Sequence, residues 1–211
     1  MKTLIAIAGI AMAVSMGTVS VADACSRNVS SQASGTYVPT KGINQNLLSA
    51  AVRTEVNFHR CRAGLRQLGD AGSGLTKQSG VHSGWMAKHH KLSHKSTVRG
   101  SATLKHRLNN AGVKFRTGAE NIGMVSRYQI DSQRFKIVNA NACQFVSNSG
   151  QALPAHSYAS LARHIVNLWM NSAGHRKNIL NRKVTHVSTA VAFDPRSPYC
   201  GKFWLTQAFV G

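Results

Sequence analysis

The chain has 211 residues and a formal net charge of +20, because 26 Lys and Arg residues stand against 6 Asp and Glu residues. This length suits one domain behind a leader, and no stretch after the leader is long and apolar enough to cross a membrane as a helix. So one-sided a charge attracts polyanions. We expect anionic lipid, lipopolysaccharide or acidic wall polymers as partners, and not nucleic acid as a physiological partner. A charge that serves only solubility is the alternative.

Residues 1–24 have the pattern of a secretory signal peptide. Lys2 provides the charged start, the stretch Leu4–Val14 is mostly apolar, and Ala22-Asp23-Ala24 fits a cleavage site between small residues. The pattern predicts a secreted or periplasmic protein. A lipoprotein anchor at Cys25 is not expected, because the residues before this cysteine fit the lipidation signal poorly.

The exported part of the chain contains four cysteines, Cys25, Cys61, Cys143 and Cys200. An oxidising compartment favours two disulfides among them. Of the three possible connectivities we favour Cys25–Cys61 with Cys143–Cys200. The C-x-x-C spacing of a zinc knuckle or a thioredoxin-like redox pair does not occur.

The first half of the exported chain is predicted to be mainly helical. Residues 25–43 are rich in Ser, Thr and Gly, which predicts an irregular arm. Apolar residues recur at helical spacing over 47–68 and over 75–91, so we expect two amphipathic helices there. A shorter helix is expected over 102–110, ended by Gly112 because glycine commonly follows a helix C-terminus.

The middle of the chain is predicted to contain one strand and an inserted loop. Residues 120–125 are short and apolar enough for a strand. Residues 128–138 are expected to be helical. The segment near 139–156 is rich in Asn, Ser and Gly around a cysteine, and predicts a loop insertion held by a disulfide.

The C-terminal part carries the clearest patterns. Residues 157–170 have apolar side chains at helical spacing, and Ser157 can cap the start of that helix. Alternating apolar residues over 187–193 and 203–210 predict two strands of a hairpin. Helices first and a hairpin last indicate an α+β fold in which helices enclose a sheet.

Three polar side chains lie at the ends of predicted elements. His94 follows the second long helix, Glu120 opens a strand, and His175 follows a Ser-Ala-Gly turn after helix 157–170. Two neutral imidazoles and a carboxylate can hold a divalent cation, zinc by preference, with His94 and His175 as ligands. The same groups can act as acid and base, or can form a buried hydrogen-bonded network that only joins three segments. Neither H-E-x-x-H nor Gly-x-Ser-x-Gly occurs to favour a known hydrolase class.

Three motifs resemble those of a known family. They are His82-Ser-x-x-Met86-Ala with Leu92-Ser-His94, then Ala119-Glu-Asn-Ile122, then Trp169-x-x-Ser172-x-Gly-His175-Arg-x-Asn-Ile-Leu180. Their order and spacing resemble the bacterial branch of the CAP superfamily, which groups cysteine-rich secretory proteins, antigen 5 and pathogenesis-related proteins. The resemblance covers about residues 44–211. It implies a three-layer α-β-α sandwich with a central antiparallel sheet and a cleft.

The resemblance also implies which residues form the cleft. His94 and His175 match the two family histidines, and Glu120 matches the first of two acids. Ser172 stands where the second acid would be, so neither a full metal cage nor a pair of catalytic carboxylates is complete. We expect six residues to line the ligand cleft: His94, Glu120, Asn121, Ser172, His175 and Arg176. Relatives variously bind divalent cations, sterols or other lipids, and wall components.

Three functions remain open at this point. We expect a secreted binding module with a cleft for a divalent cation or a small or lipid ligand, and a basic surface for anionic envelope components. One alternative is a peptidase-like hydrolase that uses Glu120 with His94 or His175 as acid and base. The other is a basic, membrane-active or antimicrobial protein. The missing second acid argues against an enzyme.

Overall fold

The computed structural model describes residues 25–211, and the signal peptide predicted for residues 1–24 lies outside them. The helices are α2 (Ser31–Gly35), α3 (Gln45–Arg62), α4 (Ser73–His89), α5 (Leu104–Asn110), α6 (Tyr158–Asn171) and α7 (Ala173–Ile179). The strands are β1 (Gly69–Asp70), β2 (Gly118–Ser126), β3 (Phe135–Asn139), β4 (Gln144–Ser147), β5 (His186–Asp194) and β6 (Lys202–Val210).

The central sheet has four strands in the order β1-β5-β6-β2. Strand β6 lies inside the sheet and pairs antiparallel with both β5 and β2. The predicted hairpin and the predicted strand near Glu120 are therefore confirmed, with β2 beginning two residues earlier, at Gly118. The two-residue strand β1 is parallel to β5, so the sheet is mixed at this edge rather than wholly antiparallel.

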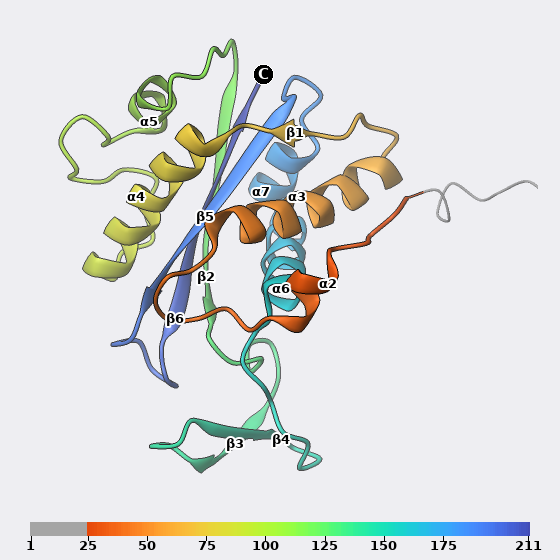
Figure 1. Ribbon diagram of the computed structural model, residues 1–211, viewed down its shortest axis with the longest axis vertical. Coiled ribbons are helices and arrows are strands. Elements are labelled where there is room, and N and C mark those ends of the chain that lie inside the picture. Colours follow the sequence, from red (N-terminus) through yellow and green to blue (C-terminus); the bar gives the residue numbers. More distant parts are fainter. Residues whose placement is uncertain (1–24) are drawn as a thin grey trace, which may run out of the picture.

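Helices cover both faces of this sheet, as Figure 1 shows, with α4 and α5 on one side and α3, α6 and α7 on the other. Alternate side chains of β6 pack against the helices on the two faces of the sheet. Phe203 belongs to the larger apolar cluster under α3 and α6, whereas Trp204 packs with Trp85 under α4. Because β6 is covered on both faces, both alternating sets of its side chains are buried. The predicted three-layer α-β-α sandwich is confirmed.

The long helices begin and end within two residues of the predicted positions, except for the end of α3. Ser157 caps α6 by accepting a hydrogen bond from the Ser160 amide, as expected. Helix α3 ends at Arg62 rather than continuing to residue 68. Gly64, two residues beyond this end, adopts a φ of +66°, and a left-handed residue at this place closes a helix. The chain is thereby freed to turn toward β1.

The N-terminal arm is more ordered than predicted. Ser30 caps the short helix α2 by accepting a hydrogen bond from the Ala33 amide. Ala33 and Val38 are buried in the larger cluster. The predicted disulfide Cys25–Cys61 ties the start of the arm to the end of α3. The arm expected over 25–43 is thus irregular apart from α2, and it packs against the core.

The helix predicted over 128–138 is wrong, and the loop insertion predicted near 139–156 contains the short strand β4. Strands β3 and β4 form a separate antiparallel hairpin, which projects from the body of the molecule in Figure 1. The ring of Phe135 packs edge-on against Phe145 and Tyr199, at centroid distances of 5.8 and 5.2 Å. Aromatic and β-branched residues favour a strand where they meet such cross-strand partners.

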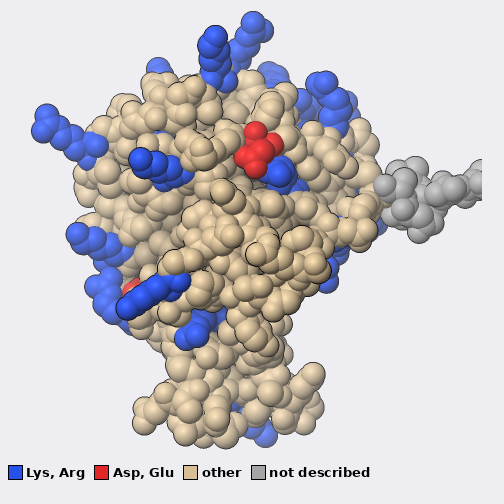
Figure 2. All heavy atoms as spheres, in the orientation of Figure 1, with Lys and Arg blue, Asp and Glu red and all other residues tan. Residues whose placement is uncertain are grey.

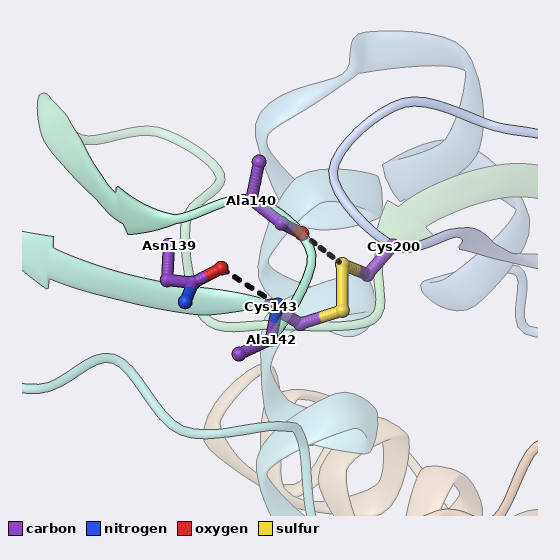
Figure 3. Close-up of a disulfide and its surroundings, with 5 residues drawn as sticks. All are labelled: Asn139, Ala140, Ala142, Cys143 and Cys200. Carbon is purple, nitrogen blue, oxygen red and sulfur yellow. Dashed lines mark hydrogen bonds between the residues drawn. A yellow bond between two sulfur atoms is a disulfide. The ribbon is translucent and has the colours of Figure 1, made fainter.

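The second predicted disulfide joins this hairpin to the turn between β5 and β6. Figure 3 shows Cys143 bonded to Cys200, whose sulfur lies 3.7 Å from the carbonyl oxygen of Ala140. The Asn139 side chain accepts a hydrogen bond from the Ala142 amide at 3.0 Å, which closes the β3–β4 turn. Both predicted disulfides are confirmed. Between residues 25 and 211, no helix has the length and apolar character needed to span a membrane.

Candidate functional site

Glu120 is the centre of the predicted site, and its carboxylate is almost completely buried, with 3% of the side chain exposed. Its Oε1 lies 2.9 Å from His94 Nδ1, and its Oε2 accepts a hydrogen bond from Arg107 Nη2 at 2.5 Å. The Nε2 of His82 is 4.0 Å from Oε1 but only 2.8 Å from the carbonyl oxygen of Ser93. Both carboxylate oxygens are thus engaged within the protein.

His94 covers this carboxylate from the solvent side. Helix α4 ends at His89, and His94 lies in the loop that follows, with 56% of its side chain exposed. The structure brings His94 and Glu120 together as predicted. Because one imidazole nitrogen contacts a buried acid while the ring faces solvent, His94 is the part of the pair that a ligand reaches first.

Arg107 is a partner of Glu120 that was not predicted from the sequence. It lies on α5 with 1% of its surface exposed, and also donates to the carbonyl oxygens of Ser101 and His94 at 3.1 and 3.3 Å. A signal for it exists in the sequence. Arg107 follows Leu104 by three residues and precedes Leu108 by one, so it occupies the apolar face of its helix. A charged side chain on such a face needs an opposite charge.

His175 was predicted to follow a Ser-Ala-Gly turn, but it lies on helix α7. Ser172 has extended backbone angles, with φ −99° and ψ 122°, and separates α6 from α7 without its side chain capping the second helix. Gly174 is therefore helical instead of ending α6. Burial, followed by the nearby His94, lowers the pKa of His175, which favours the neutral form of its ring.

An amide cluster docks α7 on the sheet. Asn121 Nδ2 donates to the carbonyl oxygen of His175 at 3.3 Å and to Gln207 Oε1 at 3.1 Å. Asn178 Nδ2 donates to the Glu120 carbonyl oxygen at 3.1 Å and to Asn121 Oδ1 at 2.9 Å. These bonds carry His175 to the same end of β2 as Glu120. Asn178 and Gln207 were not among the predicted site residues.

Arg176 has a structural partner. Its Nη1 donates to the carbonyl oxygen of Met170 at 2.9 Å. Arg176 therefore braces the junction between α6 and α7.

The predicted zinc site fits these contacts poorly. Across residues 25–211, no group of three or more His, Cys, Asp or Glu side chains is placed to hold a metal ion. The Arg107 guanidinium contacts the one carboxylate that a metal would share with His94, and its charge repels a cation. The arrangement instead fits a hydrogen-bonded network that joins α5, β2 and the loop after α4.

His156 is buried in a different part of the molecule. It helps to line a pocket of about 480 Å³ together with His164 and Asp131, and none of His94, Glu120 or His175 lines that pocket. Burial and the neighbouring His164 lower the pKa of His156 to about 4. The imidazole is therefore neutral over most of the physiological pH range.

The chain is similar to one known protein family and to several solved structures. The model of a family described as "CAP: Cysteine-rich secretory protein family" matches residues 12–209. A solved extracellular SCP-domain protein of Bacillus anthracis is 22% identical with a TM-score of 0.49, over 79% of this chain and 41% of that chain. An outer surface protein of Borrelia burgdorferi is 12% identical with a TM-score of 0.48, over 75% of this chain and 89% of that chain.

A cysteine-rich secretory protein of Staphylococcus aureus is 16% identical with a TM-score of 0.43, over 82% of this chain and 40% of that chain. This chain thus spans only about two fifths of the Bacillus and Staphylococcus proteins. No curated protein sequence matches it significantly.

Proposed function

Because the chain belongs to the CAP, or cysteine-rich secretory protein, family, we propose that it is an exported binding protein whose basic surface attaches it to anionic components of the cell envelope. Its two disulfides support export, since disulfides persist in oxidising compartments. The contacts of Glu120 and Arg107 with His94 support this surface by holding the loop after α4 in place.

The proposal rests on which charged side chains have partners within the protein. Each acidic residue in the described range has a partner within the molecule: Glu55 with Arg27 and Arg163, Asp70 with Arg53, Glu120 with Arg107, Asp131 with Ser126, and Asp194 with Arg196. No lysine in the same range takes part in an ion pair. In Figure 2 blue side chains project all around the visible face, whereas red is confined to small patches beside blue.

The basic charge is dense next to the His94–Glu120 pair. The segment from the end of α4 to α5 exposes a set that we call the basic loop surface: Lys88, Lys91, Lys95, Arg99 and Lys105. No acidic residue occurs between Asp70 and Glu120 to offset it. Such a surface favours phosphate-rich or carboxylate-rich partners and repels divalent cations.

The contacts of Glu120 do not favour a hydrolase. A general base needs an oxygen that can accept a proton from water or substrate. Arg107 and His94 already engage the two oxygens of this carboxylate, and Ser172 supplies no second acid. We therefore keep binding as the proposed function and leave zinc out of it.

Sedimentation with lipid vesicles tests the proposal. We expect the protein to bind phosphatidylglycerol vesicles and not phosphatidylcholine vesicles, with affinity falling as salt rises from 50 to 200 mM, because salt screens exposed charges. The variant Lys91→Gln/Lys95→Gln/Arg99→Gln should bind roughly a hundredfold more weakly, since each basic residue near an anionic membrane contributes about 1 kcal/mol.

A second triple variant, Lys41→Gln/Arg134→Gln/Lys136→Gln, removes the same charge from exposed positions elsewhere and serves as the matched control. It should keep most of the affinity. Binding that ignores salt, or that survives in the first triple variant, contradicts the proposal.

A further inference from the structure

A second pocket, of about 320 Å³, lies between the end of α3, the loop that follows it and the segment leading into β5. Three arginines, Arg60, Arg66 and Arg182, line it, and no Asp or Glu does so. None of these arginines forms an ion pair with another residue in the range 25–211. The pocket is thus a concave, positively charged site without a protein counter-charge.

Arg60 is the fixed element of this site, with only 2% of its surface exposed. Its Nε donates to the carbonyl oxygen of Arg66 at 2.9 Å, and its Nη1 donates to those of Ile179 and Asn181 at 2.7 and 2.9 Å. These three acceptors hold the plane of the guanidinium in one orientation. They come from the loop after α3 and from the end of α7, so the fold itself positions the group.

One nitrogen of Arg60 remains unused. Nη2 has no acceptor among the contacts of the described chain, yet it is not among the buried polar atoms that are both sealed from solvent and unpaired. Because Arg60 lines the pocket, Nη2 is available to a molecule that enters it. The other two arginines are exposed at the rim and free to close over such a molecule.

No opposite charge within the described residues offsets the free-energy cost of burying the Arg60 guanidinium. Burial, followed by the like charge of Arg66, lowers the pKa of Arg60, but a guanidinium stays protonated in proteins. A buried cation that is hydrogen-bonded only to neutral carbonyl groups remains uncompensated. An anion that entered the pocket would supply the missing charge.

We infer that this pocket binds a phosphoryl group, with Arg60 as the fixed donor at its base and Arg66 and Arg182 as the mobile donors at its rim. Guanidinium groups match the oxygens of phosphate with paired, charge-assisted hydrogen bonds. The inference goes beyond the proposed function, because it assigns one group to one pocket formed by residues outside the basic loop surface. The phosphoryl group can come from a membrane head group or from a soluble phosphate.

Inorganic phosphate is the probe for the first test, at constant ionic strength with chloride as the replacement anion. Calorimetric titration should detect binding to the wild type, and Arg66→Gln/Arg182→Gln should weaken it at least tenfold. The variant Arg116→Gln/Arg134→Gln, which removes the same charge from exposed positions outside the pocket, should bind as the wild type does. Absence of phosphate binding to the wild type, or equal losses in both variants, overturns the inference.

A second test distinguishes the sources and separates this site from the proposed function. Vesicles containing phosphatidic acid are bound to the protein, and inorganic phosphate is added at constant ionic strength. Release of the protein supports a head-group ligand, and retention with phosphate bound supports a soluble one. If Arg66→Gln/Arg182→Gln keeps salt-sensitive binding to phosphatidylglycerol while losing phosphate, the pocket and the basic loop surface are separate sites.

Discussion

Arg60 and Arg107 are buried to nearly the same extent, at 2% and 1% exposure, yet their surroundings differ in one respect. Each donates hydrogen bonds to backbone carbonyl oxygens, and only Arg107 also meets a carboxylate, that of Glu120. The first arginine lines a pocket and the second closes a network. The charge of Arg107 is neutralised within the protein, whereas that of Arg60 is left for a ligand to neutralise.

The largest expected effect on stability comes from removing Arg107, the cation that neutralises Glu120. Arg107→Met leaves the Glu120 carboxylate buried without its cation, which costs about 4 kcal/mol of folding free energy. Urea denaturation measures the loss. The double variant Arg107→Met/Glu120→Gln removes both charges and should recover at least half of it. A loss below about 1 kcal/mol in the single variant would show that Glu120 does not depend on this partner.

The intermediate effect on stability is expected at a buried histidine, because histidine can lose its proton and arginine cannot. The pKa of His156 is lowered to about 4, below the value near 6.5 of an unfolded chain, so the unfolded state takes up the proton first as pH falls. Stability from this group is complete above pH 6.5 and declines by about 3 kcal/mol toward pH 4. Urea denaturation at pH 7 and pH 4 should show this decline in the wild type. His156→Gln should lack that part of it, and identical pH slopes would rule out His156 as its source.

The smallest of the three effects is expected at Arg60. Arg60→Met leaves no buried acid without a partner. It leaves only backbone carbonyl groups unpaired, and water can reach them from the pocket. We therefore expect a loss of about 2 kcal/mol of folding free energy. Denaturation with and without phosphate provides the measurement. Phosphate should stabilise the wild type and not this variant. A loss as large as that of Arg107→Met would mean that the two arginines do not differ in the way described above.

The elements with strong local patterns were predictable from the sequence. The capped helix α6 and the alternating strands β5 and β6 were expected within a residue or two of where they lie, because their apolar periods match a face that is buried. The motifs around His94, Glu120 and His175 also led to segments that do meet. His94 and Glu120 are in direct contact, and Asn121 and Asn178 bring α7 to the same end of β2.

What could not be predicted depends on partners that are distant along the chain. The residues of β3 form a strand because Phe135 meets Phe145 and Tyr199, whereas local propensity over 128–138 allowed a helix. The face of α5 that is buried depends on Glu120, which lies outside that helix. Arg107 was therefore not among the predicted site residues, although its position beside Leu108 favoured the interior.

The central position of β6 has a consequence for the order in which the protein folds. Strands β2 and β5 share no hydrogen bonds with each other and are joined only through β6. A chain synthesised only as far as Cys200 therefore cannot form this sheet, and its helices lack the surface on which they pack. Contacts between residues 118–126 and 202–210 are also widely separated along the chain, which slows folding. We expect the polypeptide to remain loose until its last strand has emerged, a state that suits passage through an export channel.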